Sequence, residues 1–383
     1  MPRPMQAGDD AKARNLLASP FGHRPGAVAT VARVPSHPLF SNVRRSPYFP
    51  RTEAAGATAY MAYNHMYMPM AYGRDPAEDY RALTEAVTLW DVGAERQVEL
   101  HGPDALRFAD RLVTRDVAGL ERGRCRYALV CDDDGVVLAD PVLLVVDDDR
   151  VWLSHGNVDL LHWVRGVAHG AGLDVRVTEA DVAPMQVQGP RSRDVLRPLV
   201  GGVVDELGFE LFPRRTADAL AIWDAVAAAG EPHGLLVTGP NVVRAVEGGI
   251  TDTTWATGMG ANALELDGGR LVDLDAGDFV GREALRRLQA AGGARRRTVG
   301  LAGDGPPVPR LDQAWPVTRG GAAVGATRWA VWSERLGRNL AVGLVAVEAA
   351  APGTALELQA PDGARPVEVV ELPFLPPPPG ARD

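Results

Sequence analysis

An aspartate inside an apolar run is the first feature of this chain that calls for a chemical explanation. Residues 136–146 read VVLADPVLLVV, and Asp140 interrupts what we expect to be a half-buried strand. A carboxylate in a desolvated pocket can orient an amine or stabilise a nearby positive charge. The alternative is an acid beside a turn, capped by backbone N–H groups. We expect that solvated environment for the aspartates at 132–134 and 147–149.

Other residue types that carry chemistry give weaker signals. Cys125 and Cys131 have a C-x5-C spacing that matches no common zinc or redox motif, so we expect two free thiols and no metal site. The formal net charge of −9 argues against a nucleic acid or an anionic membrane as a partner. No apolar run reaches the length of a membrane span, and the N-terminus lacks a secretory pattern, so we expect a cytoplasmic location.

Hydrophobic periodicity divides the chain into three regions. Residues 1–50 are rich in Pro, Arg and Ala and predict an N-terminal arm. Residues 51–294 alternate between helical and strand periods, which predicts mixed α+β domains. Residues 295–383 contain short alternating runs between Gly, Pro and Asp turns, which predicts a small all-β domain. Helices are expected over 75–92, 103–117, 157–172, 216–230 and 281–293.

An ordered series of segments carries a family resemblance. EDYRALTEAVTLWDVGAERQVELHGPDALRFADRLVTRDV, GVVLADPVLLVV, PMQVQGPRSRDVL, VVRAVEGGITD and VGATRWAVWSERLGRNLAVGLV follow one another in this order. Over residues 50–383 the series resembles the aminomethyltransferase (glycine-cleavage T-protein) family. YNHM, ERQVE and DPVLL are similar to its dimethylsulfoniopropionate demethylase branch. The resemblance implies an α+β fold in three parts, with two mixed domains and a C-terminal β-barrel around a central tetrahydrofolate pocket.

The resemblance also implies roles for residues on the cofactor side of that pocket. Asp140 matches the family's pocket aspartate, which implies an orienting and electrostatic role beside the reactive nitrogen of folate. Tyr127 is similar to a pocket tyrosine, with core packing as the alternative. Glu247 is similar to the glutamate that grips the pterin, against the alternative of a helix-surface acid paired with Arg244. Arg282 is a candidate for the folate tail carboxylate, against a plain salt bridge within its helix.

Aromatic residues are the candidates for the substrate side. The segment YMAYNHMYMPMAY at 60–72 is rich in aromatic residues and methionine and carries little charge. A sulfonium or quaternary ammonium group has no N–H to donate, so its recognition falls to aromatic faces. Tyr63, His65 and Trp163 are therefore substrate-binding candidates, with ordinary core packing as the alternative for each. Trp329 and Trp332 are assigned to the barrel, where they could close the pocket.

The segment LVGGVVDELGFELF at 199–212 departs from the family pattern. The helix pattern RSRDVLRPLV meets ELGFE almost at once, and an Arg-Thr-Gly-aromatic-Thr-Gly-Glu motif that normally precedes this point is absent. A few tens of residues are missing, which predicts a shortened middle domain with an exposed strand edge. Either a second subunit covers this edge, making a homodimer, or the pocket stays wide and folate binds weakly.

Three functions follow from these observations. The first is a tetrahydrofolate-dependent demethylase that moves a methyl group from a small S-, O- or N-methyl compound to folate. The second is a folate-independent enzyme of specialised metabolism on the same scaffold. The third is a non-catalytic binding relative such as an iron–sulfur assembly factor, although the Lys-Gly-Cys-Tyr-x-Gly-Gln-Glu motif of that group is absent.

Overall fold

The computed structural model describes residues 42–200, 208–250, 258–266, 269–275, 277–311 and 313–376, all within one compact unit of residues 37–383. Most of the predicted arm at 1–50 lies outside the described residues. Residues 201–207, at the point where the sequence predicts a deletion, also lie outside them. The α-helices are α1 Phe49–Ala54, α2 Pro76–Glu85, α3 Ala105–Leu112, α4 Leu160–Ala171, α5 Ser192–Val200, α6 Ala219–Gly230, α7 Val242–Glu247 and α9 Arg282–Ala290.

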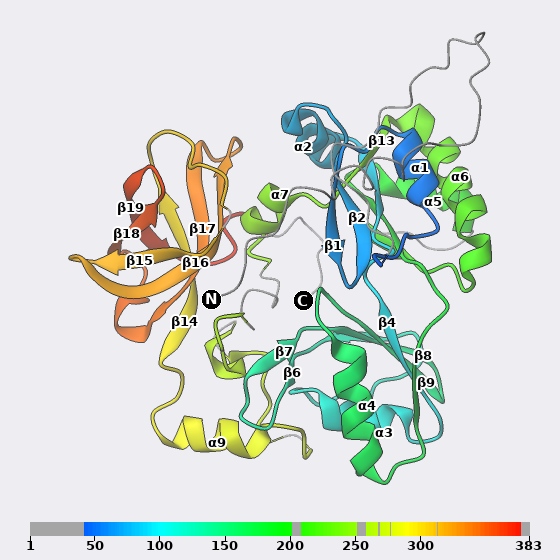
Figure 1. The fold of residues 1–383 in the computed structure, drawn as a ribbon, viewed down its shortest axis with the longest axis horizontal. Helices are drawn as coiled ribbons and strands as arrows, with labels where there is room; N and C mark the ends of the chain where they lie inside the picture. The colour runs from blue at the N-terminus through cyan, green and yellow to red at the C-terminus, as the bar shows by residue number, and fades with distance from the viewer. Residues whose placement is uncertain are drawn as a thin grey trace, which may run out of the picture. The chain divides into compact units, whose positions relative to one another are not determined.

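The C-terminal region is a closed antiparallel barrel, as the sequence predicts (Figure 1). Its interior includes Leu301, Trp315, Val317 and Leu358, each at most 1% exposed. Closure leaves no strand edge, because every strand has a neighbour on both sides. In the order β14-β17-β16-β15-β18-β19, the strands are β14 Arg296–Gly303, β17 Arg338–Ala346, β16 Ala322–Ser333, β15 Trp315–Arg319, β18 Ala355–Ala360 and β19 Gly363–Val370.

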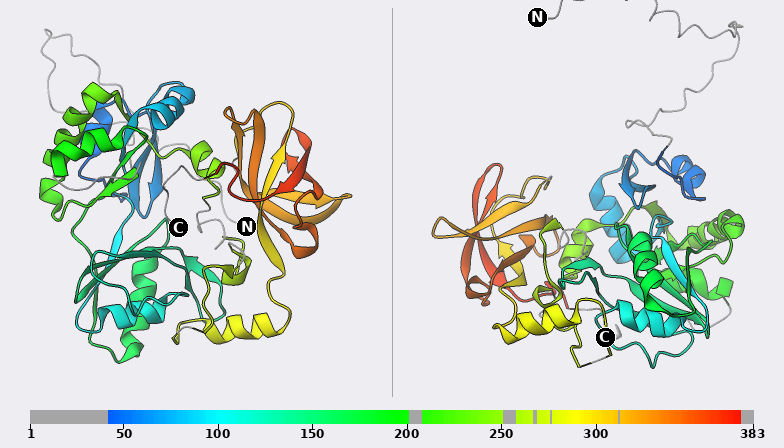
Figure 2. Two further views of the ribbon diagram at one scale, coloured as in Figure 1. Left: turned by 180° about the vertical axis from the view of Figure 1, so that it is seen from behind. Right: turned by 60° about the horizontal axis from the view of Figure 1, so that its bottom comes forward.

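A five-stranded antiparallel sheet presents one face to helices and the other away from them. Helices α3 and α4 cover one face, where Phe108, Leu143 and Leu153 are buried (Figures 1 and 2). Because side chains alternate along a strand, Tyr127, which pairs with Val142, lies on the opposite face from Leu143. In the order β10-β4-β9-β8-β5, the strands are β10 Arg176–Glu179, β4 Gln97–His101, β9 Arg150–Ser154, β8 Val142–Asp147 and β5 Cys125–Tyr127.

A four-stranded mixed sheet corrects one helix prediction. The helix expected over 75–92 ends at Glu85, and Val87–Asp91 forms β3 instead. All five residues of β3 are buried, and β3 lies between two neighbours, so its continuous apolar run belongs to a central strand. In the order β12-β11-β3-β13, the other strands are β12 Gly208–Leu211, β11 Met185–Gln188 and β13 Leu235–Thr238.

Two short hairpins complete the strands. β1 Ala59–Tyr63 pairs with β2 Met66–Ala71, and β6 Val130–Cys131 pairs with β7 Val137–Ala139. β12 forms an edge of its sheet, and β11 is paired on both sides. Cys125 and Cys131 are both free thiols. In the described part of the chain, every helix is too short or too polar to cross a bilayer.

Candidate functional site

Asp140 occupies the break between two strands that belong to different sheets. The apolar run at 136–146 is not one strand, because β7 ends at Ala139 and β8 begins at Val142. Pro141 supplies no backbone N–H, so the ladder cannot continue through this point. The Tyr127 hydroxyl donates a 2.8 Å hydrogen bond to Asp140 Oδ2. Because the Tyr127 side chain is exposed, this pair faces accessible space rather than the core.

Gly156 brings a third predicted residue to the same place. A Cβ added at Gly156 would lie 3.1 Å from the Tyr63 hydroxyl oxygen and 3.9 Å from Asp140 Oδ1. The tyrosine and the aspartate therefore face the same glycine, which follows β9. Tyr63, Tyr127 and Asp140 come from three separate segments of the chain. Their polar atoms lie around one small volume, which a side chain at Gly156 would fill.

Two glutamates that the sequence did not single out share this region. Glu95 follows β3 and is half-buried. Burial raises the pKa of Glu95 well above its usual value, and the negative charges of Glu210 and Asp140 raise it further. Glu210 extends from β12, and partial desolvation by its neighbours raises its pKa as well. The negative charges of Glu210 and Asp140 beside Glu95 make the region favourable for a positive charge.

The other substrate candidates lie elsewhere. His65 is in the turn between β1 and β2, where its φ is +60°. Its exposed imidazole Nε2 lies 3.1 Å from Asp159 Oδ1. Trp163 is in α4, packed against the hydrophobic core beneath the five-stranded sheet. Neither residue is among those that converge on Asp140. The position of Trp163 agrees with core packing, which was the alternative for this residue.

Asn64, the neighbour of His65, positions the hairpin beside the candidate site. Its buried side chain accepts a 2.9 Å hydrogen bond from the Val158 backbone N–H. The Asn64 amide donates to the carbonyls of Ala94 and His155. These bonds connect the turn after Tyr63 to the segments that carry Glu95 and Gly156. Apart from an asparagine in a turn, no sequence pattern indicates this role.

Glu247 is part of a buried bridge between three segments. Its side chain is 0% exposed, which rules out the surface-acid alternative. The Tyr80 hydroxyl of α2 donates to Oε2 over 2.7 Å. The Ser333 hydroxyl, at the end of β16, donates to Oε1 over 2.6 Å. Burial raises the pKa of Tyr80 to about 12, and the hydrogen bond to Glu247 contributes to the shift.

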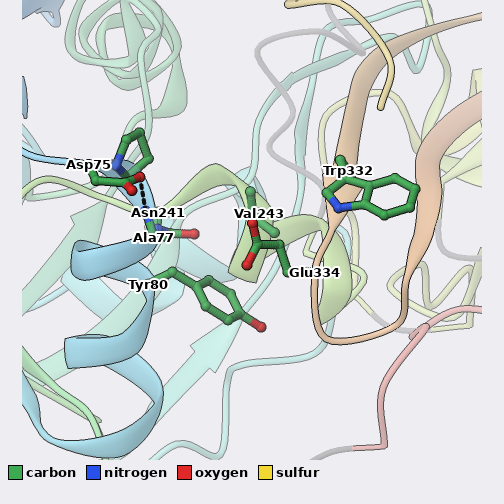
Figure 3. Close-up of a pocket in the computed structure, with 8 residues that line it drawn as sticks. Asp75, Ala77, Tyr80, Asn241, Val243, Trp332 and Glu334 are labelled. Carbon is green, nitrogen blue, oxygen red and sulfur yellow. Dashed lines mark hydrogen bonds between the residues drawn. The ribbon is translucent and has the colours of Figure 1, made fainter. Parts of the chain in front are cut away.

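A cavity of about 230 Å³ adjoins this bridge (Figure 3). Tyr80 and Trp332 contribute aromatic side chains to its lining, and Asp75 and Glu334 contribute carboxylates. Arg282, the remaining candidate, begins α9, and its Nε donates to the Leu274 carbonyl over 3.0 Å. That contact is neither the predicted salt bridge within the helix nor a contact with the Asp140 region.

Comparison with known proteins identifies the family. The model of the GCVT N-terminal domain matches residues 48–204, and that of the glycine cleavage T-protein C-terminal barrel domain matches residues 296–375. The chain belongs to the aminomethyltransferase (glycine-cleavage T-protein) family, whose members are enzymes that transfer one-carbon groups. The resemblance inferred from the sequence is therefore confirmed.

Individual relatives agree with this assignment. The dimethylsulfoniopropionate demethylase of Ruegeria pomeroyi is 33% identical, with 86% of this chain and 96% of the relative covered. The aminomethyltransferase of Symbiobacterium thermophilum is 30% identical, with 87% and 97% covered. The crystal structure of the glycine cleavage system aminomethyltransferase T from Bartonella henselae superposes with a TM-score of 0.75 at 19% identity, over 87% of this chain and 98% of that one. This last likeness confirms the fold.

Proposed function

We propose that this enzyme is a tetrahydrofolate-dependent demethylase that acts on a small S-, O- or N-methyl compound, and that the methyl donor is positively charged. The observation that carries the proposal is the convergence of Asp140, Tyr63 and Tyr127 beside Glu95. The charges that raise the pKa of Glu95 are those of Glu210 and Asp140, both negative. A sulfonium or quaternary ammonium group would relieve this repulsion. Dimethylsulfoniopropionate, which names the demethylase from Ruegeria pomeroyi, contains such a sulfonium.

The residues around Asp140 suit methyl transfer from a cation. This reaction needs an in-line approach of donor and acceptor and no strong acid. The Tyr127 hydroxyl fixes one oxygen of the Asp140 carboxylate. Asp140 then orients the nucleophile and balances the positive charge that develops on it. The Tyr63 side chain flanks the opening left by Gly156 and limits the size of the group that enters.

The carboxylates also suit the cofactor that the family implies. Tetrahydrofolate carries N–H donors on its reduced pterin, and carboxylate oxygens are the acceptors that such donors prefer. When bound, tetrahydrofolate supplies the nitrogen that accepts the methyl group. Asp140 is the residue that we assign to orient this nitrogen. Glu247 is fully buried and its two oxygens accept from the Tyr80 and Ser333 hydroxyls, and its contact with the pterin stays a prediction.

Binding and turnover together test this proposal. Calorimetry with tetrahydrofolate under reducing conditions should show binding. Incubation with dimethylsulfoniopropionate or a betaine should yield methyl-tetrahydrofolate, detected by mass spectrometry, whereas a neutral thioether should react far more slowly. Asp140→Asn should lower turnover more than tenfold, which corresponds to at least ~1.4 kcal/mol of barrier.

Asp133→Asn is the matched control, because Asp133 is exposed in the turn between β6 and β7. It should leave turnover unchanged. Full turnover in the Asp140→Asn variant would refute the role of Asp140. Absence of folate binding in the wild-type enzyme would favour the folate-independent alternative.

A further inference from the structure

The cavity beside the Glu247 bridge is built from three separate elements. Tyr80 and the first residues of α2 form one wall, Asn241 and Val243 at the start of α7 form another, and Trp332 with Glu334 closes it from the end of β16 (Figure 3). Asp140 and its neighbours are not among the lining residues. The volume of about 230 Å³ is several times the ~30 Å³ share of one water molecule. It is below the roughly 300–1,000 Å³ of drug-sized sites, so the cavity suits a small ligand.

The lining combines aromatic faces with negative charge. Trp332 and Tyr80 provide an indole and a phenol, and Asp75 and Glu334 provide carboxylates. Asp75 already accepts a 3.0 Å hydrogen bond from the Ala77 backbone N–H, whereas Glu334 is exposed in the turn after β16. Within the described residues no ion pair joins either carboxylate to a basic side chain.

Two polar atoms of the lining are already engaged in hydrogen bonds. The Tyr80 hydroxyl is committed to Glu247, and Asn241 accepts from the Arg244 backbone N–H to cap α7. Arg335 and Arg244 lie close enough to influence Tyr80, but neither lines the cavity. The lining also presents two aromatic faces and the exposed carboxylate of Glu334. Cations without N–H groups are recognised by aromatic faces in this way, with Trp as the strongest partner.

We propose that this cavity is a second binding site, which takes a small methylated cation such as a quaternary ammonium or sulfonium group. The cation lies against Trp332 and Tyr80, and Glu334 supplies the counter-charge. The inference is independent of folate chemistry at Asp140. Tyr80 and Ser333, the neighbour of Trp332, both donate to Glu247, so a ligand here also strengthens the contact between α2, α7 and the barrel.

Fluorine NMR on the full chain labelled with 5-fluorotryptophan tests the site directly. The chain has 8 tryptophans, and Trp332→Phe assigns the resonance of Trp332. Choline is the probe, and 3,3-dimethylbutan-1-ol, its uncharged analogue of the same shape, is the control ligand. We expect a saturable shift of the Trp332 resonance with choline. The alcohol should bind about threefold or more weakly, the factor expected for a cation–π contact at a partly exposed site.

Variants separate this site from others on the molecule. Glu334→Gln, in an exposed turn where it cannot disturb the core, should weaken choline binding. Glu348→Gln changes an equally exposed barrel carboxylate outside the cavity and should have no effect. Asp140→Asn should also leave the Trp332 response intact.

Three results would overturn the inference. The first is a Trp332 resonance that does not respond to choline. The second is equal binding of choline and the alcohol, which would show an apolar pocket without cation selectivity. The third is a choline response that Asp140→Asn abolishes, which would place the ligand at the candidate active site instead.

Discussion

Replacing Tyr80 by phenylalanine removes one of the two hydroxyl groups that donate to the buried Glu247 carboxylate. The bond is 2.7 Å long and its acceptor is 0% exposed, so the variant leaves a buried carboxylate oxygen without this donor. A hydrogen bond to a charged group contributes about 1.5–3 kcal/mol. We therefore expect Tyr80→Phe to lower the free energy of unfolding by about 1.5–3 kcal/mol. Urea denaturation followed by circular dichroism measures this change.

A second variant shows whether the charge of Glu247 is responsible. In the Glu247→Gln background the same bond joins two neutral groups, so Tyr80→Phe should cost only about 0.5–1.5 kcal/mol. The difference between the two backgrounds is the coupling energy of the pair. Tyr72→Phe is the matched control, because its buried hydroxyl has no hydrogen-bond partner in the described structure. That substitution should be neutral or slightly stabilising.

The pH dependence gives an independent measure of the same bond. The folded pKa of Tyr80 is about 12, above the usual value near 10 for tyrosine. The neutral phenol is the form that the fold favours, so its contribution is complete below about pH 10 and is lost as the pH rises through about 12. The gap between wild type and Tyr80→Phe should shrink over that interval. A Tyr80→Phe variant within about 0.5 kcal/mol of wild type at neutral pH would refute the buried-bridge reasoning.

Three further predictions concern the Asp140 region. Tyr127→Phe should lower turnover by about tenfold, or ~1.4 kcal/mol of barrier, and should leave the melting temperature unchanged because this hydrogen bond is exposed. A loss of stability without a loss of turnover would contradict the positioning role of Tyr127. The folded pKa of Glu95 is raised to about 8, so its contribution to stability is complete below about pH 4.5 and is lost as the pH rises through 8. In thermal melts, the melting temperature of Glu95→Gln should therefore rise relative to that of wild type from pH 5 to 9, and parallel profiles would exclude the shift. Asn64→Ala should lower the free energy of unfolding, measured by urea denaturation, by about 3 kcal/mol, because it removes buried hydrogen bonds at a residue with φ of +49°. A decrease no larger than that of a surface substitution would show that other contacts hold the turn.

Some of the candidate site could be predicted from the sequence, because those residues stand out locally. Asp140 interrupts an apolar run and was visible as an exception to a pattern, whereas Tyr127 was a candidate through the family resemblance. Glu95 and Glu210 were missed because they lie 115 residues apart and look like ordinary polar residues. The pairing of β12 with β11 and of β11 with β3 brings their segments together.

The fold shows the same division between local and distant information. The barrel was predictable because alternating runs and turns follow one another over residues 296–370. The helix predicted over 75–92 was wrong in its second half, because Val87–Asp91 has a sequence compatible with either state and burial between two strands decides the outcome. Trp163 was a substrate candidate by residue type alone, and its place on α4 directs it to the core.

The short edge strands of the five-stranded and four-stranded sheets bear on how this protein associates. β5 has 3 residues, and β10, β12 and β13 have 4 each, while the barrel has no edge. Such short ladders are poor templates for intermolecular strand pairing, which protects a folded chain from aggregation. They also restrict how a homodimer could form beside residues 201–207. Extension of the sheet through β12 would add very few backbone hydrogen bonds, so a stable dimer would have to bury side chains instead.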